Sequence, residues 1–160
     1  MRKYFGMVLA VVTAFSTGAG VAQAQAPDSP FAWNQLYRAE KERRPEAVAR
    51  ILRKGTNANI ENDEGLRPLY WAAKQGDLAI VDLLVQAGAD IDSPGMLGTP
   101  LHAAADEGYV DVVAYLVDHG AAVDALGDSK KTPLHMAVFN DRGAVAEFLI
   151  GCAQQLVRSV

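Results

Sequence analysis

The chain has 160 residues, half of them hydrophobic, and a formal net charge of −4 at neutral pH. An acidic chain without a basic stripe is poorly suited to the phosphate backbone of DNA or RNA, which excludes nucleic acid as the expected partner. The single cysteine, Cys152, excludes an intramolecular disulfide. Because it lies beside Leu149 and Ile150 near the end of a predicted helix, we expect a buried structural thiol rather than an intermolecular disulfide.

The first 24 residues predict a secretory signal peptide. Arg2 and Lys3 give a positive start, residues 4–15 form a largely apolar run, and Ala22-Gln23-Ala24 supplies the small residues that signal peptidase reads. The apolar run is shorter than the roughly 20 residues that cross a bilayer, so no stable membrane anchor is expected after cleavage.

Cleavage there predicts a mature chain that begins at Gln25 and carries a formal net charge of −6. Residues 25–31 then form a linker to the folded domain. The shape of the signal favours a bacterial source, and the expected location is periplasmic or secreted.

Three stretches in the remainder of the chain repeat one another. Residues 67–73 read Arg-Pro-Leu-Tyr-Trp-Ala-Ala, residues 99–105 read Thr-Pro-Leu-His-Ala-Ala-Ala, and residues 132–138 read Thr-Pro-Leu-His-Met-Ala-Val. Their prolines follow one another at intervals of 32 and 33 residues. A fixed period of this size predicts a stack of small units, none of which can bury its apolar face alone.

Each stretch starts a short predicted helix. Thr99 and Thr132 stand at the N-cap position, and a proline follows at the first helical position, where no N–H is missed. After Gly76 and Gly108, apolar residues recur at helical spacing and predict a second helix. An extended segment and a turn come next, so the unit is a helix, a turn, a helix and a projecting hairpin loop.

With this opening and the Gly-Ala-Asp-Ile-Asp ending of residues 88–92, the units resemble ankyrin repeats. The resemblance implies an all-α ankyrin-repeat solenoid of about four helix–turn–helix units with projecting hairpin loops, over residues 32–160. The units are placed at 32–64, 65–97, 98–130 and 131–160. The resemblance also implies that each opening histidine exchanges hydrogen bonds with its threonine and the nearby backbone. The residues of this structural motif are Thr99, Pro100, His102, Thr132, Pro133 and His135.

The two end units depart from the pattern. The first lacks the Thr-Pro opening, and in the last Asp141 replaces the inter-helix glycine. Terminal units of a solenoid must turn one face to water. The charged residues of the first unit that we expect to do so are Arg38, Glu40, Lys41, Glu42, Arg43, Arg44, Arg50 and Arg53.

No motif of catalysis or cofactor binding stands out. The chain contains no paired histidines or cysteines at metal-ligand spacing, no glycine-rich phosphate loop and no serine nucleophile elbow. His119 falls at a predicted helix end, where an imidazole favours the helix dipole and faces water. We therefore expect neither an enzyme nor a bound metal or cofactor. A hydrolase or metal-dependent enzyme on an atypical repeat scaffold stays open as an alternative.

Function is then expected at the concave face, formed by the first helix of each unit and the hairpin tips. Aromatic and methionine side chains are enriched at interface hot spots, so Trp71, Met136 and Phe139 are predicted anchors. The alternative for Trp71 and Phe139 is that they pack over a neighbouring hairpin. The predicted partner-binding residues on the helices and at one hairpin tip are Trp71, Lys74, Gln75, Met96, Leu97, Asp106, Glu107, Met136, Phe139 and Asn140.

These features predict an exported, monomeric protein that binds another protein through its concave face. The chain is similar to periplasmic ankyrin proteins associated with catalase function and peroxide resistance, which implies an accessory role in oxidative defence. An immunity-type inhibitor of a periplasmic toxin is the alternative. The neighbouring gene would separate the two, because it would encode a catalase in one case and a secreted toxin in the other.

Overall fold

The computed structural model describes residues 30–127 and 129–158. The predicted signal peptide and its cleavage site before Gln25 lie outside the described residues. Helix α3 begins at Pro30, so the last two residues of the expected linker are helical. Within the described part of the chain, no helix is long and apolar enough to cross a membrane.

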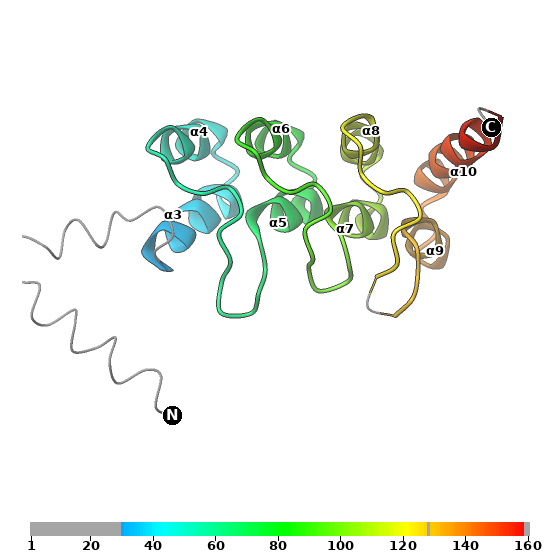
Figure 1. Cartoon of the computed structure of the whole chain (residues 1–160), viewed down its shortest axis with the longest axis horizontal. Coiled ribbons are helices and arrows are strands. Elements are labelled where there is room, and N and C mark those ends of the chain that lie inside the picture. Colours follow the sequence, from blue (N-terminus) through cyan, green and yellow to red (C-terminus); the bar gives the residue numbers. More distant parts are fainter. Residues whose placement is uncertain (1–29, 128, 159–160) are drawn as a thin grey trace, which may run out of the picture.

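The described chain is a row of helix pairs, which confirms the predicted all-α solenoid (Figure 1). One layer holds the first helix of each pair and the other layer holds the second. The loops between pairs project past the first layer. The surface made by the first layer and these loops is the one that the sequence analysis called the concave face, and we call it the inner face from here on. The helices of the first layer, called the inner helices below, are α3 (Pro30–Lys41), α5 (Pro68–Gln75), α7 (Pro100–Glu107) and α9 (Pro133–Phe139). The helices of the second layer, called the outer helices, are α4 (Pro45–Arg53), α6 (Leu78–Gln86), α8 (Val110–Asp118) and α10 (Gly143–Arg158).

The turn between the paired helices follows one backbone rule in every unit. Gly76 and Gly108 end their helices in the left-handed region, with φ of 69° and 91°. At the same place in the end units, Arg43 and Asp141 adopt φ of 51° and 58° without the freedom of glycine. The left-handed residue is therefore required by the turn, and the repeat frame extends to both ends of the stack.

Stacking supplies the core. Leu101, Leu116 and Leu84 are fully buried, and they belong to one apolar cluster that extends from α3 to α10. The outer helices are also joined by polar contacts. The Tyr115 hydroxyl on α8 donates to Asp82 on α6 at 2.7 Å. This bond lowers the pKa of Asp82, and burial together with the bond raises the pKa of Tyr115 to about 12.

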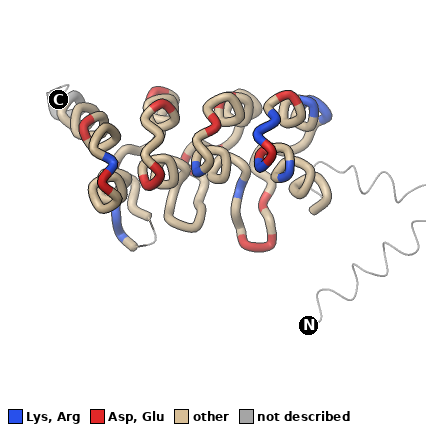
Figure 2. The backbone as a smooth tube through the Cα atoms, turned by 180° about the vertical axis from the view of Figure 1, so that it is seen from behind, with Lys and Arg blue, Asp and Glu red and all other residues tan. Residues whose placement is uncertain are grey.

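Charge is divided along the stack (Figure 2). Residues 30–54 contain seven Lys or Arg and three Asp or Glu, whereas residues 55–127 contain two Lys or Arg and twelve Asp or Glu.

Most of the charged residues predicted to face water in the first unit do so, but Glu40 is only 1% exposed. It stands where Ala73 and Ala105 stand in the next units, and those residues face the inside of the stack. Cys152, predicted to be buried, is partly exposed.

Candidate protein-binding site

The two opening histidines fix the inner helices that carry the inner face. The backbone N–H of Thr99 donates to Nδ1 of His102 at 3.1 Å, so Nδ1 is the acceptor and Nε2 carries the proton. Nε2 then donates to the carbonyl oxygen of Lys131 at 2.9 Å. Since Lys131 belongs to the hairpin before α9, the fully buried ring ties one unit to the next. Thr132 repeats the first bond with Nδ1 of the exposed His135, also at 3.1 Å.

We expect His102→Ala to lower the free energy of unfolding by about 1–2 kcal/mol, because it leaves the Thr99 N–H without its acceptor and removes the bond to the Lys131 carbonyl, which keeps the bond from the Gly127 N–H. His135→Ala is the matched control. His135 is exposed, and among the described residues its ring bonds only to Thr132 of its own unit, so its loss is expected to cost about half as much or less. Urea unfolding of the two variants measures the difference, and equal losses would mean that the inter-unit bond contributes nothing.

Trp71 lies in an aromatic cluster on the first two inner helices. Trp33 stacks on Tyr37 at 4.8 Å between ring centroids, and the Tyr37 and Trp71 rings form a T-shaped pair with 5.6 Å between their centroids. The Lys74 ammonium lies 5.8 Å from the Trp71 ring centroid. Trp71 is half-buried, and its ring contacts the inner helix of the preceding unit through Tyr37. The residue keeps part of its surface exposed, although its indole Nε1 is buried.

Met136 is buried, with 7% of its surface exposed, so the expectation of an exposed side chain is wrong. It occupies in α9 the fourth position that Trp71 occupies in α5 and Ala103 in α7. Trp71 turns toward the preceding inner helix, and Ala103 is fully buried. This helix position is therefore buried for Ala103 and Met136, and only partly exposed for the larger Trp71.

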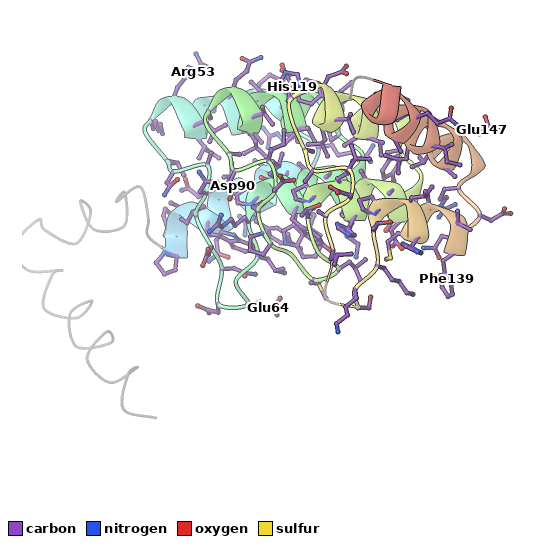
Figure 3. The ribbon with its side chains drawn as sticks, turned by 45° about the vertical axis from the view of Figure 1, so that its right-hand side comes forward. Arg53, Glu64, Asp90, His119, Phe139 and Glu147 are labelled. Atoms are coloured by element: carbon purple, nitrogen blue, oxygen red, sulfur yellow. The ribbon has the colours of Figure 1, made fainter. Side chains whose placement is uncertain are left out.

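Phe139 is the most exposed large apolar side chain among the described residues, at 76%, and it projects from the end of α9 (Figure 3). The Lys131 ammonium lies 4.5 Å from its ring centroid. An exposed aromatic beside a cation is a combination that protein interfaces use. Lys131 was not among the residues that the sequence singled out, and only the packing of the hairpin brings it to Phe139.

Polar groups on the inner helices are tied across units. Asn140 donates through Nδ2 to the Asp106 carboxylate, and Arg142 donates through Nε to the Asp106 carbonyl at 3.0 Å. The Gln75 carbonyl accepts from the Arg43 guanidinium. The Asp106 and Asn140 side chains are thus held against each other. Both residues are half-buried, as are Gln75, Lys74 and Glu107.

The hairpin tips add apolar groups to the inner face. The tip at Met96 and Leu97 is closed by the Gly95–Gly98 bridge, with the Gly95 N–H donating to the Gly98 carbonyl at 2.7 Å. Met96 is 56% exposed, whereas Leu97 is half-buried. Leu126, on the next hairpin, is 68% exposed, and the sequence analysis did not predict it as a binding residue. Its place beside the turn at Gly127 was the available signal.

No group of three or more potential metal ligands occurs in the part of the chain that the structure describes. His119 is exposed at the end of α8, where its ring stacks on Tyr115 at 4.0 Å and bonds to the Tyr115 carbonyl at 2.8 Å. The absence of catalysis stays a prediction.

Comparison with known proteins agrees with this architecture. A family model described as ankyrin repeats in three copies matches residues 6–95 and 93–158. Over 46 residues the chain is 39% identical to the human protein named Ankyrin repeat and SOCS box protein 3, and the match covers 29% of this chain and 9% of that protein. The ankyrin repeat is a protein–protein interaction module that is typically not enzymatic. The helix pairs, the capped openings and the family match together show that this chain belongs to the ankyrin-repeat family.

Proposed function

We propose that this protein binds a partner protein through its inner face, with Phe139 as the main apolar anchor. The observation that carries the proposal is the 76% exposure of Phe139, the largest exposed fraction among the large apolar side chains of the described residues, on a helix where Pro133, Met136 and Ala137 are buried. A phenylalanine left in water is costly, and aromatic side chains that become buried on binding contribute much of the affinity of an interface. Lys131 beside the ring supplies a charge at the rim of the contact.

The charges along the inner face suggest what the partner presents. Arg38, Lys41 and Lys74 lie on the first two inner helices, and Asp106 and Glu107 lie on the third. Complementary charges on a partner fix its orientation and speed its association more than they add affinity. The proposed partner therefore has an apolar pocket for Phe139 and an acidic patch that faces α3 and α5.

Phe139→Ala is expected to weaken partner binding by about 2 kcal/mol, which is roughly thirtyfold in affinity, while thermal unfolding stays unchanged. The exposed ring contributes little to the core, so the fold does not depend on it. Phe31→Ala is the matched control, since Phe31 is also exposed, at 52%, but lies on the first helix at the opposite end of the stack. Calorimetric titration with the captured partner measures both variants, and equal affinities would place the interface away from Phe139.

The proposed setting is the periplasm of a bacterium or the extracellular space, on the support of the charged start, the apolar run and Ala22-Gln23-Ala24. We expect a mature product that begins at Gln25 in the exported fraction. N-terminal sequencing of the purified protein checks this expectation, and a cytoplasmic product that retains Met1 contradicts it.

Within that setting, we propose an accessory role in catalase function and peroxide defence, on the support of the resemblance to periplasmic ankyrin proteins. An immunity-type inhibitor of a periplasmic toxin is the alternative partner class. Affinity capture from the exported fraction with wild-type and Phe139→Ala protein, followed by mass spectrometry, decides between them. A catalase that is lost with the variant supports the first role, whereas a secreted toxin that is lost with the variant supports the second.

A further inference from the structure

We propose that copies of this chain stack head to tail, with the C-terminal end face of one copy docking on the N-terminal end face of the next in the register of the internal repeats. The N-terminal end face is formed by the open side of α3 and α4, and the C-terminal end face by the open side of α9 and α10. The two faces lie at opposite ends of the row of helices (Figure 1).

The N-terminal end face leaves repeat-core positions uncovered. The third residue of α6, α8 and α10 is Ile80, Val112 or Val145, and each is 0% exposed. The same residue of α4, Ala47, is half-exposed, as is Ile51, whose counterparts Leu84, Leu116 and Leu149 are buried. Ala47 and Ile51 line a hollow of about 320 Å³ between α3 and α4, together with Phe31 and Arg44. In every later unit the preceding unit fills this place.

The C-terminal end face leaves the matching positions uncovered. The sixth residue of an inner helix is Ala73 in α5 and Ala105 in α7, both 0% exposed, but Val138 in α9 is 64% exposed. On α10, Ile150 is 44% exposed. Terminal units of a solenoid normally carry a polar outer face. Both faces therefore carry the apolar surface of a unit that still lacks its neighbour.

Charged residues at the two end faces occupy the same helix positions as two residues that form a polar contact between neighbouring units inside the stack. Inside the stack, the sixth residue of α8, Tyr115, donates to the fifth residue of α6, Asp82, at 2.7 Å. The sixth residue of α4 is Arg50, and the fifth residue of α10 is Glu147, both exposed. Glu147 projects at the C-terminal end of the molecule (Figure 3). Stacking a second copy in register brings Arg50 to Glu147, an opposite-charge pair in place of the internal hydrogen bond.

A second internal contact repeats across the same junction. Arg142, the residue before α10, donates to the carbonyl oxygen of Asp106, the seventh residue of α7. The residue before α4 is also an arginine, Arg44, and its side chain is 61% exposed. The seventh residue of α9 is Phe139, so the junction sets Arg44 against the backbone carbonyl of Phe139. This contact does not use the Phe139 ring, and the proposal is independent of the partner-binding role of that ring.

These matches select a second copy as the occupant. Both faces have the register of the repeat, and the Arg50–Glu147 and Arg44–carbonyl pairs form only when unlike ends meet. Such a heterologous contact leaves one free end face at each end of an open oligomer, so further copies add one after another. The monomer expected from the sequence is then the species at low concentration. The average mass in sedimentation velocity should rise with concentration beyond that of a dimer, and added salt should reduce it.

Charge-reversed variants test the register. Arg50→Glu and Glu147→Arg each place like charges across the junction, and each is expected to weaken self-association about tenfold or more. An equimolar mixture of the two variants restores opposite charges at every mixed junction, and so does the double variant; both should associate as the wild type does. Arg53→Glu, a reversal at another exposed position of α4, is the matched control and should associate normally.

Circular dichroism and thermal unfolding establish that each variant is folded. The average mass of each of the three single variants, of the double variant and of the mixture is then compared with that of the wild type. A wild type that stays monomeric at every concentration overturns the proposal. It is equally overturned if the single reversals associate normally, or if neither the mixture nor the double variant recovers. A wild type that forms only a closed dimer at every concentration would also reject head-to-tail stacking, because that stacking leaves a free end face on every oligomer.

Discussion

Replacing Leu101 with alanine is expected to lower the free energy of unfolding by about 2–5 kcal/mol. Leu101 is 0% exposed and lies at the second position of α7, inside the apolar cluster shared by neighbouring units. Truncation removes its apolar contacts and leaves a cavity, because the helices around it are held by their own caps and cannot collapse freely. In a repeat protein the stability of one unit also depends on its neighbours, so the loss at α7 weakens the junctions on both sides.

Urea unfolding followed by circular dichroism measures this loss. Leu126→Ala is the matched control, since Leu126 is 68% exposed on a hairpin and should change stability by less than about 0.5 kcal/mol. If Leu101→Ala changes stability as little as the control does, Leu101 is not a core residue and the repeat frame is misplaced.

Replacing Glu40 with alanine is expected to raise the free energy of unfolding by about 2–3 kcal/mol at neutral pH. Glu40 is 1% exposed, and neither carboxyl oxygen has a hydrogen-bond partner among the described residues. A buried, unpaired carboxyl loses its hydration without compensation. Alanine is the residue at this position in α5 and α7, where it is fully buried, so the substitution fits the packing of the stack.

The gain should depend on pH. Burial raises the pKa of Glu40 well above its usual value of 4.5. Between the ordinary pKa of the unfolded chain and the raised pKa of the folded chain, the folded state holds a proton that the unfolded state has lost. Stability of the wild type therefore falls as the pH rises through this range. The advantage of Glu40→Ala should be smallest at acid pH, grow above the ordinary carboxyl pKa, and level off above the folded pKa.

Unfolding at a series of pH values tests the assignment, with Glu64→Ala as control. Glu64 lies exposed at a hairpin tip (Figure 3), so its removal should change stability by less than about 0.5 kcal/mol at any pH. A Glu40→Ala variant that is less stable than the wild type at neutral pH would mean that the carboxylate has a stabilising partner.

The sequence alone determined the repeat frame, because the signals that set it are local. Pro100 and Pro133 mark helix starts, Gly76 and Gly108 mark left-handed turns, and apolar spacing marks the faces that stack. Caps and turns act within a few residues of the chain, so they are readable without neighbours. The expected turn at Asp141 followed from the same frame, and the structure confirms it with φ of 58°.

The tertiary structure decided which side chains reach the surface, because that depends on the unit next to each residue. Trp71 and Met136 share one position, yet Tyr37 of the preceding unit meets the Trp71 ring while Met136 is buried. Glu40 occupies an alanine position, and burial follows from the position rather than from the charge. Val138 is 64% exposed, although its counterparts Ala73 and Ala105 are fully buried, because no described helix pair follows α10. A periodic sequence specifies the contacts within and between equivalent units, whereas the exposure of each residue depends on the size of the side chains across the seam and on where the stack ends.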